Sequence, residues 1–264
     1  MEATLTFLGT GTSMGVPTLG CACPVCTSSD QRDKRLRPSV LLRWQQNGQD
    51  RSISIDTGPD FRIQGLRAGI SRIDAVLYTH AHADHILGLD DLRPLSYAIG
   101  REGAHIRLLA TQETASVLER VYDYTLSPDA TYKHRARVQL EPLPDQFELF
   151  GASFTRVPLL HGNLEVSGFR FGRTAYLTDV SEIPESSFAL LEGLDCLILS
   201  ALRHAPHPNH ATVAQAVEWA KRIGARQTWF THISHELGHE QTNQTLPSGM
   251  ALAYDELSFP VVLQ

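Results

Sequence analysis

The densest group of potential metal ligands in this chain lies between residues 79 and 85, which read Thr-His-Ala-His-Ala-Asp-His. Imidazole and carboxylate together suit zinc, manganese or iron, and four such ligands on one turn indicate two ions rather than one. Residues 73–78, directly before them, are apolar and β-prone, so we expect the ligands to follow the C-terminal end of a buried strand. The alternative is a polar loop whose histidines only satisfy local hydrogen bonds. The candidate ligands are His80, His82, Asp84 and His85.

Three further candidates follow strand-like runs later in the chain. They are His161, Asp179 and His232. Two ions need more ligands than residues 80–85 provide, and these three could supply them. Any one of them alone could equally be a polar group satisfied in the core or in a loop.

A second cluster, Cys-x-Cys-x-x-Cys, is formed by Cys21, Cys23 and Cys26. Such close spacing favours one shared metal ion over disulfides in a reducing compartment. Three thiolates leave tetrahedral zinc one ligand short, and His235, three residues after His232, is the expected fourth. We expect alternation along an extended stretch to let this segment serve two sites. Four protein ligands leave no place for water, so this zinc would be structural; a redox-active thiol pair is the alternative.

The remaining cysteine, Cys196, lies in an apolar run and is expected to be a small buried hydrophobic residue.

Composition narrows the class of protein. The 264 residues are 42% hydrophobic and contain no run of the roughly 20 apolar residues that a membrane span needs. Neither a linker nor a repeat divides the chain, so we expect one domain over residues 1–264. The N-terminus lacks the pattern of a signal peptide, which predicts a cytoplasmic protein. A net charge of −6 argues against a long nucleic acid as substrate but not against a small phosphorylated molecule.

Hydrophobic patterning predicts a mixed α/β protein. Helices are predicted at 111–122, 184–192 and 212–223, the last with an N-cap at Thr212 or Asn209 and a stop at Gly224. Strands are predicted at 4–8, 40–44, 52–55, 75–78, 106–109, 153–157, 174–177, 196–199 and 227–230, with a strand-like end at 257–263.

The motif at 80–85 resembles the His-x-His-x-Asp-His signature of the metallo-β-lactamase-fold hydrolases. Together with the glycine-rich stretch 9–17, the cysteine cluster and Thr-His-Ile-Ser-His at 231–235, it resembles the PhnP-type phosphodiesterases. Those enzymes act on 5-phosphoribosyl 1,2-cyclic phosphate. The resemblance implies an αββα sandwich, a small phosphodiester as substrate and no membrane partner, and it is compatible with a homodimer.

The resemblance also implies roles for individual residues. His80, His82 and His161 would hold one catalytic ion, and Asp84, His85 and His232 the other. Asp179 would bridge the two ions, which could be manganese, zinc or iron. Asp56, after the run at 52–55, would support the ligand loop without binding metal.

Two such ions can lower the pKa of a shared water and neutralise phosphate oxygens. The leaving alkoxide then needs a proton, and the resemblance points to His210 as its donor. Asp84 could help to steer the nucleophile. His204 and His207 could contact the substrate's phosphate, whereas His105, His134 and His239 have no context that indicates a role.

Several other functions fit parts of the pattern. A tRNA 3′-processing endonuclease shares the ligands, but we find no glycine-rich basic insertion that would grip tRNA. PqqB-like cofactor-biosynthesis proteins pair this fold with a cysteine zinc site but typically degrade the ligands that are intact here. β-Lactamases usually carry Cys where Asp179 stands, and glyoxalase II needs a C-terminal helical domain. A non-catalytic binding module is the alternative from a different class.

Overall fold

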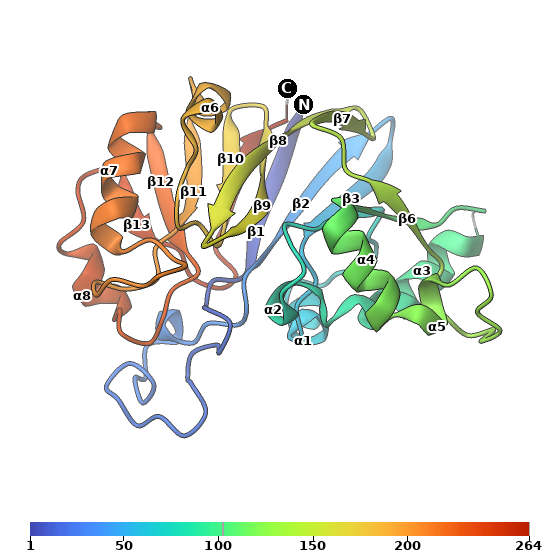
Figure 1. Ribbon diagram of the computed structural model, residues 1–264, viewed down its shortest axis with the longest axis horizontal. Helices are drawn as coiled ribbons and strands as arrows, with labels where there is room; N and C mark the ends of the chain where they lie inside the picture. The colour runs from blue at the N-terminus through green and yellow to red at the C-terminus, as the bar shows by residue number, and fades with distance from the viewer. Residues whose placement is uncertain (102, 264) are drawn as a thin grey trace.

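The computed structural model describes residues 1–101 and 103–263, in which two seven-stranded sheets pack face to face (Figure 1). The first sheet has the order β14 (Ser258–Val262), β1 (Glu2–Gly9), β2 (Ser39–Gln46), β3 (Gln49–Ile55), β4 (Ala75–Leu77), β5 (Ile106–Ala110) and β6 (Val138–Pro142). The second has the order β13 (Met250–Leu252), β12 (Gln227–Thr231), β11 (Cys196–Ser200), β10 (Thr174–Leu177), β9 (Leu164–Phe171), β8 (Ala152–His161) and β7 (Gln146–Leu149).

Both sheets combine an antiparallel half with a parallel half. Strands β14, β1, β2 and β3 pair antiparallel, and β3 to β6 pair parallel. In the second sheet β7 to β10 pair antiparallel, and β10 to β13 pair parallel. The parallel halves place the C-terminal ends of several strands at a common edge, where α/β proteins usually build their sites.

Helices cover the outer face of each sheet (Figure 1). Beside the first sheet lie α1 (Phe61–Arg67), α2 (Ala83–Ile86), α3 (Arg93–Arg101), α4 (Gln112–Val121) and α5 (Asp123–Leu126). Beside the second lie α6 (Glu185–Phe188), α7 (Val213–Ile223) and α8 (His239–Asn243). Short 3-10 turns occupy η1 (Gln31–Asp33), η2 (Leu89–Leu92) and η3 (Ala189–Leu191).

Three apolar clusters hold these layers together. One lies between the sheets and takes side chains from both, such as Leu42 and Ile55 from the first and Phe169 and Ile198 from the second. The other two lie between each sheet and its helices. Burial on both faces explains why the central strands read as continuous apolar runs rather than alternating ones. The expected αββα sandwich is confirmed.

The strands predicted from apolar runs are all present, and the strand-like end is β14. Four strands escaped prediction: β6, β7, β9 and β13. Among these β13 has only three residues, and β9 contains Ser167 and Gly168, which break its apolar pattern. The helix predicted at 184–192 is instead two short pieces, α6 and η3. Helices α1, α2, α3, α5 and α8 were also not predicted, because tertiary packing rather than propensity defines such short elements.

Helix α7 begins and ends as its sequence predicts. Thr212 caps it, and its side chain and that of Gln215 form a reciprocal capping box. Gly224 ends the helix with a φ of 72°, in the left-handed region that glycine adopts without strain. This firm start fixes the loop 201–212, which carries His210.

Residues 10–38 leave the end of β1 as a long loop and project below the sheets before β2 begins (Figure 1). The loop carries the three clustered cysteines. Within the described residues, no helix has the length and apolar character needed to cross a membrane.

Candidate functional site

The predicted catalytic ligands converge from both sheets at one edge of the sandwich. His80 and His82 follow β4, and Asp84 and His85 lie in α2 directly after them. The second sheet contributes the three remaining side chains from the C-terminal ends of β8, β10 and β12. These are His161, Asp179 and His232.

Asp179 lies at the centre of the group. Its Oδ2 is 3.1 Å from His85 Nε2, and its Oδ1 is 3.1 Å from His232 Nε2 and 4.0 Å from His161 Nε2. Asp84 Oδ2 lies 3.2 Å from His85 Nε2 and 3.7 Å from His232 Nε2. In the part of the chain that the structure describes, Asp179 is therefore the carboxylate within 4.0 Å of both His161 and His85.

The candidate ligand atoms form two close groups. Those of His80, His82 and His161 lie within 4.8 Å of one another. The same limit holds for Asp84, His85, Asp179 and His232. The division matches the two ligand sets implied by the resemblance, although which atoms bind metal stays a prediction.

Hydrogen bonds fix the ring orientation of His85 and His80. Asp56, fully buried after β3, accepts a hydrogen bond from His85 Nδ1 at 2.7 Å and from the Thr79 backbone N–H and hydroxyl at 2.8 Å each. The Thr79 oxygen in turn accepts from His80 Nδ1 at 3.0 Å. Both rings therefore place a proton on Nδ1 and leave Nε2 as the nitrogen turned toward the site, where a metal ion could bind it.

His161 is held in the same way, because its Nδ1 donates to the Asn209 carbonyl at 2.6 Å. Asp56 was predicted from the sequence as a supporting residue, whereas Thr79 and Asn209 were not. Thr79 lies within the ligand motif, so its position could have indicated this role. The Asn209 contact is made by a backbone carbonyl, which every residue has, so the residue type does not indicate it.

The cluster has the properties of a cation site. Besides His232 Nδ1, four of its buried atoms have no hydrogen-bond partner among the described residues, although an unpaired buried polar atom normally costs free energy. Nitrogen and carboxylate donors aimed at one point are the ligands that zinc, manganese and iron accept. The four atoms are Nε2 of His80, His85 and His232 and Oδ2 of Asp84.

Three residues of the site adopt left-handed backbone conformations, which are uncommon for residues other than glycine. Asp56, Asp179 and His232 have φ values of 64°, 56° and 55°, and each stands just after the end of a strand. Such conformations persist where the surrounding structure holds them, and they cluster at functional sites.

Charge within the cluster perturbs its pKa values. Burial opposes the protonation of His232, but Asp179 and Asp84 outweigh it and raise its pKa to about 9. Burial likewise opposes charge on Asp179, yet His232 and His85 hold its pKa well below the usual range. The carboxylates thus attract positive charge into the site, and a metal ion that took this place would displace protons.

The predicted proton donor, His210, lies beside the candidate ligands. Its Nδ1 is 3.8 Å from Asp179 Oδ1, and its ring stacks on that of His232 at 4.7 Å between centroids. Burial, reinforced by His232, lowers the pKa of His210 to about 3. Its ligand-type atom also lies within 4.8 Å of those of His161 and Asp179, so it stands at the edge of the candidate ligand set.

Of the remaining histidines discussed above, one borders the site and the others lie away from it. The ring of His207 lies 4.9 Å from that of His210, at the border of the site. His204 is exposed, and so are His105, just before β5, and His134, between α5 and β6. His239 is buried, and its backbone N–H donates to Asp33.

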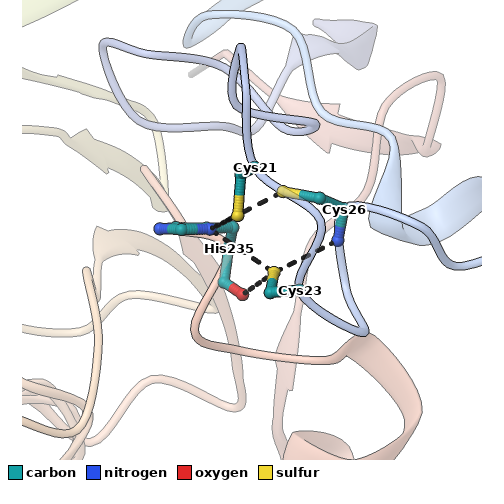
Figure 2. A group of neighbouring side chains, drawn as sticks. All are labelled: Cys21, Cys23, Cys26 and His235. Atoms are coloured by element: carbon teal, nitrogen blue, oxygen red, sulfur yellow. Dashed lines mark hydrogen bonds between the residues drawn. The ribbon is translucent and has the colours of Figure 1, made fainter.

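The predicted cysteine cluster is brought together around His235 (Figure 2). Its Nδ1 lies 3.2, 3.5 and 3.6 Å from the Sγ atoms of Cys21, Cys23 and Cys26. Zinc at about 2.3 Å from sulfur and about 2.0 Å from nitrogen would place tetrahedral S and N ligands about 3.5 Å apart. The four donors therefore have the spacing of a tetrahedral zinc site.

The thiols differ in their readiness to ionise. The Cys26 backbone N–H donates to Cys23 Sγ at 3.4 Å and lowers the pKa of that thiol to about 6, whereas burial raises the pKa of Cys26. A low thiol pKa favours the thiolate form that binds metal. Cys196 lies in the core between the sheets, as predicted.

One detail of the prediction for His235 is wrong. Alternation along an extended stretch was expected to separate it from His232, but the stretch is not extended throughout: His232 is a bend with a left-handed backbone, Ile233 forms an isolated β-bridge with Gly11, and a turn begins at His235. The left-handed conformation of His232 redirects the chain, and so the two rings reach different clusters.

Comparison with known proteins agrees with the family resemblance of the motifs. A family model described as the beta-lactamase superfamily domain matches residues 51–233. The crystal structure of a new diphosphatase from the PhnP family is 51% identical, with a TM-score of 0.90, over 99% of this chain and 98% of that one. Zn²⁺-bound PqqB from Methylobacterium extorquens is 21% identical with a TM-score of 0.70, over 97% of this chain and 99% of that one, which shows the fold alone.

An octanoyltransferase from Porphyromonas gingivalis is 36% identical over 256 residues. The match covers 95% of this chain but 50% of that protein, so the chain spans half the length of this relative.

Proposed function

This chain belongs to the PhnP family of the beta-lactamase superfamily, as its motifs predicted, and from that membership we propose that it is a metal-dependent phosphodiesterase. The observation that carries the proposal is the convergence of seven candidate ligands, four of which have buried atoms without a hydrogen-bond partner among the described residues. Its substrate would be a small phosphodiester similar to 5-phosphoribosyl 1,2-cyclic phosphate.

The ligand sets follow the two groups in the structure. The first ion would be held by His80, His82 and His161, and the second by Asp84, His85 and His232, with Asp179 shared between them. Two bound divalent ions supply Lewis-acid activation of water and of the phosphate oxygens. Manganese, zinc and iron all suit these donors.

The chain's own groups would orient the reactants and move the proton. Asp84, with one unpaired buried oxygen, would help to orient the attacking water. His210 would donate the proton to the leaving oxygen, a role assigned from its position beside Asp179. This role requires the negative charge of the bound phosphate to raise the pKa of His210 from about 3. Asp56, Thr79 and Asn209 would keep the ligand rings in one tautomer.

The cysteine cluster would hold a structural zinc ion, since four protein donors complete a tetrahedron. We also infer that residues 1–264 act as one domain, because the core between the sheets takes side chains from both halves of the chain.

A second candidate reaction is hydrolysis of a diphosphate bond, because the 51% identical relative is a diphosphatase. The two reactions differ in their leaving groups. An alkoxide is a poor leaving group and needs a proton from His210, whereas a phosphate leaves readily without one. A tRNA substrate is disfavoured by the net charge of −6, because a protein that grips tRNA needs basic surface.

The test is metal-dependent turnover of four substrates. They are bis(p-nitrophenyl) phosphate, 5-phosphoribosyl 1,2-cyclic phosphate, a set of 2′,3′-cyclic nucleotides and a diphosphate diester. The proteins compared are wild type, His210→Ala and, as a matched control, His105→Ala on an exposed segment. Each is stripped of metal and reloaded with manganese, zinc or iron.

We expect His210→Ala to slow hydrolysis of the ribosyl cyclic phosphate by about 100- to 10,000-fold. It should affect bis(p-nitrophenyl) phosphate far less, because nitrophenolate leaves without protonation. Faster turnover of the diphosphate that is insensitive to His210→Ala would favour the second candidate. If fully metal-loaded wild type hydrolyses none of these substrates, the proposal is wrong.

A further inference from the structure

The two candidate metal clusters share one short piece of chain. His232 belongs to the dinuclear group and His235 to the cysteine group, with only Ile233 and Ser234 between them. Only three peptide bonds separate the two histidines, so a displacement of one shifts the backbone of the other.

The intervening backbone is tied to the loop that carries the cysteines. Ile233 N–H donates to the Thr10 carbonyl at 2.9 Å, and its carbonyl accepts from Thr12 N–H at 3.1 Å. Arg35, fully buried at the other end of the loop, donates to the carbonyls of Ser234 at 2.9 Å and Leu237 at 2.7 Å. Residues 233–237 are thus gripped from both ends of the cysteine loop.

Arg35 is itself held firmly. Its guanidinium pairs with Asp33 Oδ1 at 2.9 Å. The backbone N–H of His239 donates to the same oxygen, also at 2.9 Å. A buried charge with all these partners has one favourable arrangement, so the loop cannot shift without breaking a costly set of contacts.

His232 needs such support more than the other buried ligands. His85 is oriented by Asp56, and His161 by the Asn209 carbonyl. His232 Nδ1, by contrast, has no hydrogen-bond partner among the described residues, and its backbone has a left-handed φ of 55°. The direction of its ring is therefore set by the backbone on either side rather than by a side-chain partner.

We propose that the cysteine–histidine cluster, when it holds its ion, positions His232 and so couples the two metal centres. The inference rests on the proposed metal assignments and adds a role for the cysteine site beyond holding its own loop. Because coupling is reciprocal, ions in the dinuclear site would also strengthen binding at the cysteine site.

The experiment measures metal binding rather than turnover. Cys21→Ser removes a donor from the far side of the cluster without altering residues 231–237, and Ser29→Ala alters an exposed side chain in the same loop as the control. Zinc is titrated by equilibrium dialysis with elemental analysis, and amide hydrogen exchange is followed across residues 231–237. Circular dichroism checks that each variant is folded.

We expect Cys21→Ser to lose the cluster ion and to bind the second catalytic ion about 10- to 100-fold more weakly, the range found when a ligand loses its support. Exchange at 231–237 should speed up, whereas Ser29→Ala should match wild type. Cys21→His, which restores a fourth donor, should recover much of the lost affinity.

Arg35→Lys provides a second variant that leaves every cysteine in place. It should keep the cluster ion yet weaken the dinuclear site, because a single ammonium nitrogen lacks the rigid fork with which two guanidinium nitrogens reach the two carbonyls and Asp33. If Cys21→Ser and Arg35→Lys both bind two catalytic ions with wild-type affinity, the coupling is refuted while the metal assignments stand. Wild type that binds no ion at all would instead refute the proposed function.

Discussion

Replacing Asp56 by asparagine should weaken metal binding while changing almost nothing in shape. One oxygen of Asp56 accepts from the Thr79 backbone N–H, and the other from the Thr79 hydroxyl and His85 Nδ1. Asparagine offers only one oxygen, so in either orientation its NH₂ group faces a donor. Leaving a buried donor unpaired in this way costs about 1–3 kcal/mol.

The metal-free protein can escape this cost, whereas the metal-bound protein cannot. Without metal, the proton of His85 can move from Nδ1 to Nε2, where Asp84 and Asp179 lie 3.2 and 3.1 Å away to accept it. Nδ1 then accepts from the asparagine NH₂. Metal binding needs a free Nε2 and reverses this change, so most of the cost falls on metal affinity. At about 1.4 kcal/mol per tenfold, we expect a dissociation constant about 10- to 100-fold higher.

The assay is competition for zinc against a chelator of known affinity, with ¹⁵N NMR of the histidine rings reporting the tautomer of His85. Asp74→Asn is the matched control. Asp74 is also buried and accepts from the Ser52 backbone N–H at 2.9 Å, but it lies at the opposite ends of the strands. It should lose stability and keep its metal affinity. An Asp56→Asn protein that binds zinc within about twofold of wild type would refute the tautomer argument.

Other expectations concern stability and can be measured by urea unfolding. Gly58→Ala should destabilise the ligand loop by about 1–3 kcal/mol, because its Cβ would lie 2.0 Å from the Asp84 carbonyl oxygen, whereas Gly65→Ala in α1 meets only ordinary contacts and should be neutral or stabilising. Thr212→Ala removes the cap of α7 and should cost about 1 kcal/mol. Burial raises the pKa of Asp255 to about 7 from 3.8, so the folded chain binds more protons than the unfolded one between these values. Through this group the free energy of unfolding falls as pH rises from about 4 to 7, and a metal-free Asp255→Asn protein should show a flatter profile.

The grouping of the candidate ligands could be predicted from sequence because such residues placed directly after apolar strands are an unusual pattern. In a sheet with parallel halves, residues that follow different strands meet at the same edge, and so His80, Asp179 and His232 come together from distant parts of the chain. The cysteine cluster was visible for a different reason, since close thiol spacing has few other uses in a reducing compartment.

What the sequence did not reveal depends on the backbone. The left-handed conformations of Asp56, Asp179 and His232 cannot be inferred from residue type. The bend at His232 and the turn that begins at His235, rather than strand alternation, bring His235 to the cysteines. The carbonyl of Asn209 supports a ligand ring through an atom that every residue possesses. Strand β9 was missed because it owes its place to pairing with β8 and β10 rather than to its own pattern.

The candidate metal site reduces the stability of the folded chain, and the surrounding sandwich compensates for it. Buried carboxylates and imidazoles with unpaired atoms lower the free energy of unfolding of the metal-free chain. Burial of apolar side chains in the three clusters of the sandwich must offset this loss. Most ligand rings recover part of that cost through a fixed partner, as His85 does with Asp56. His232 has no such partner within residues 1–101 and 103–263, and it depends on backbone contacts to the cysteine loop. A loop stabilised by its own metal ion, as we propose for the cysteine cluster, would hold that backbone without placing another buried polar group beside the candidate catalytic site.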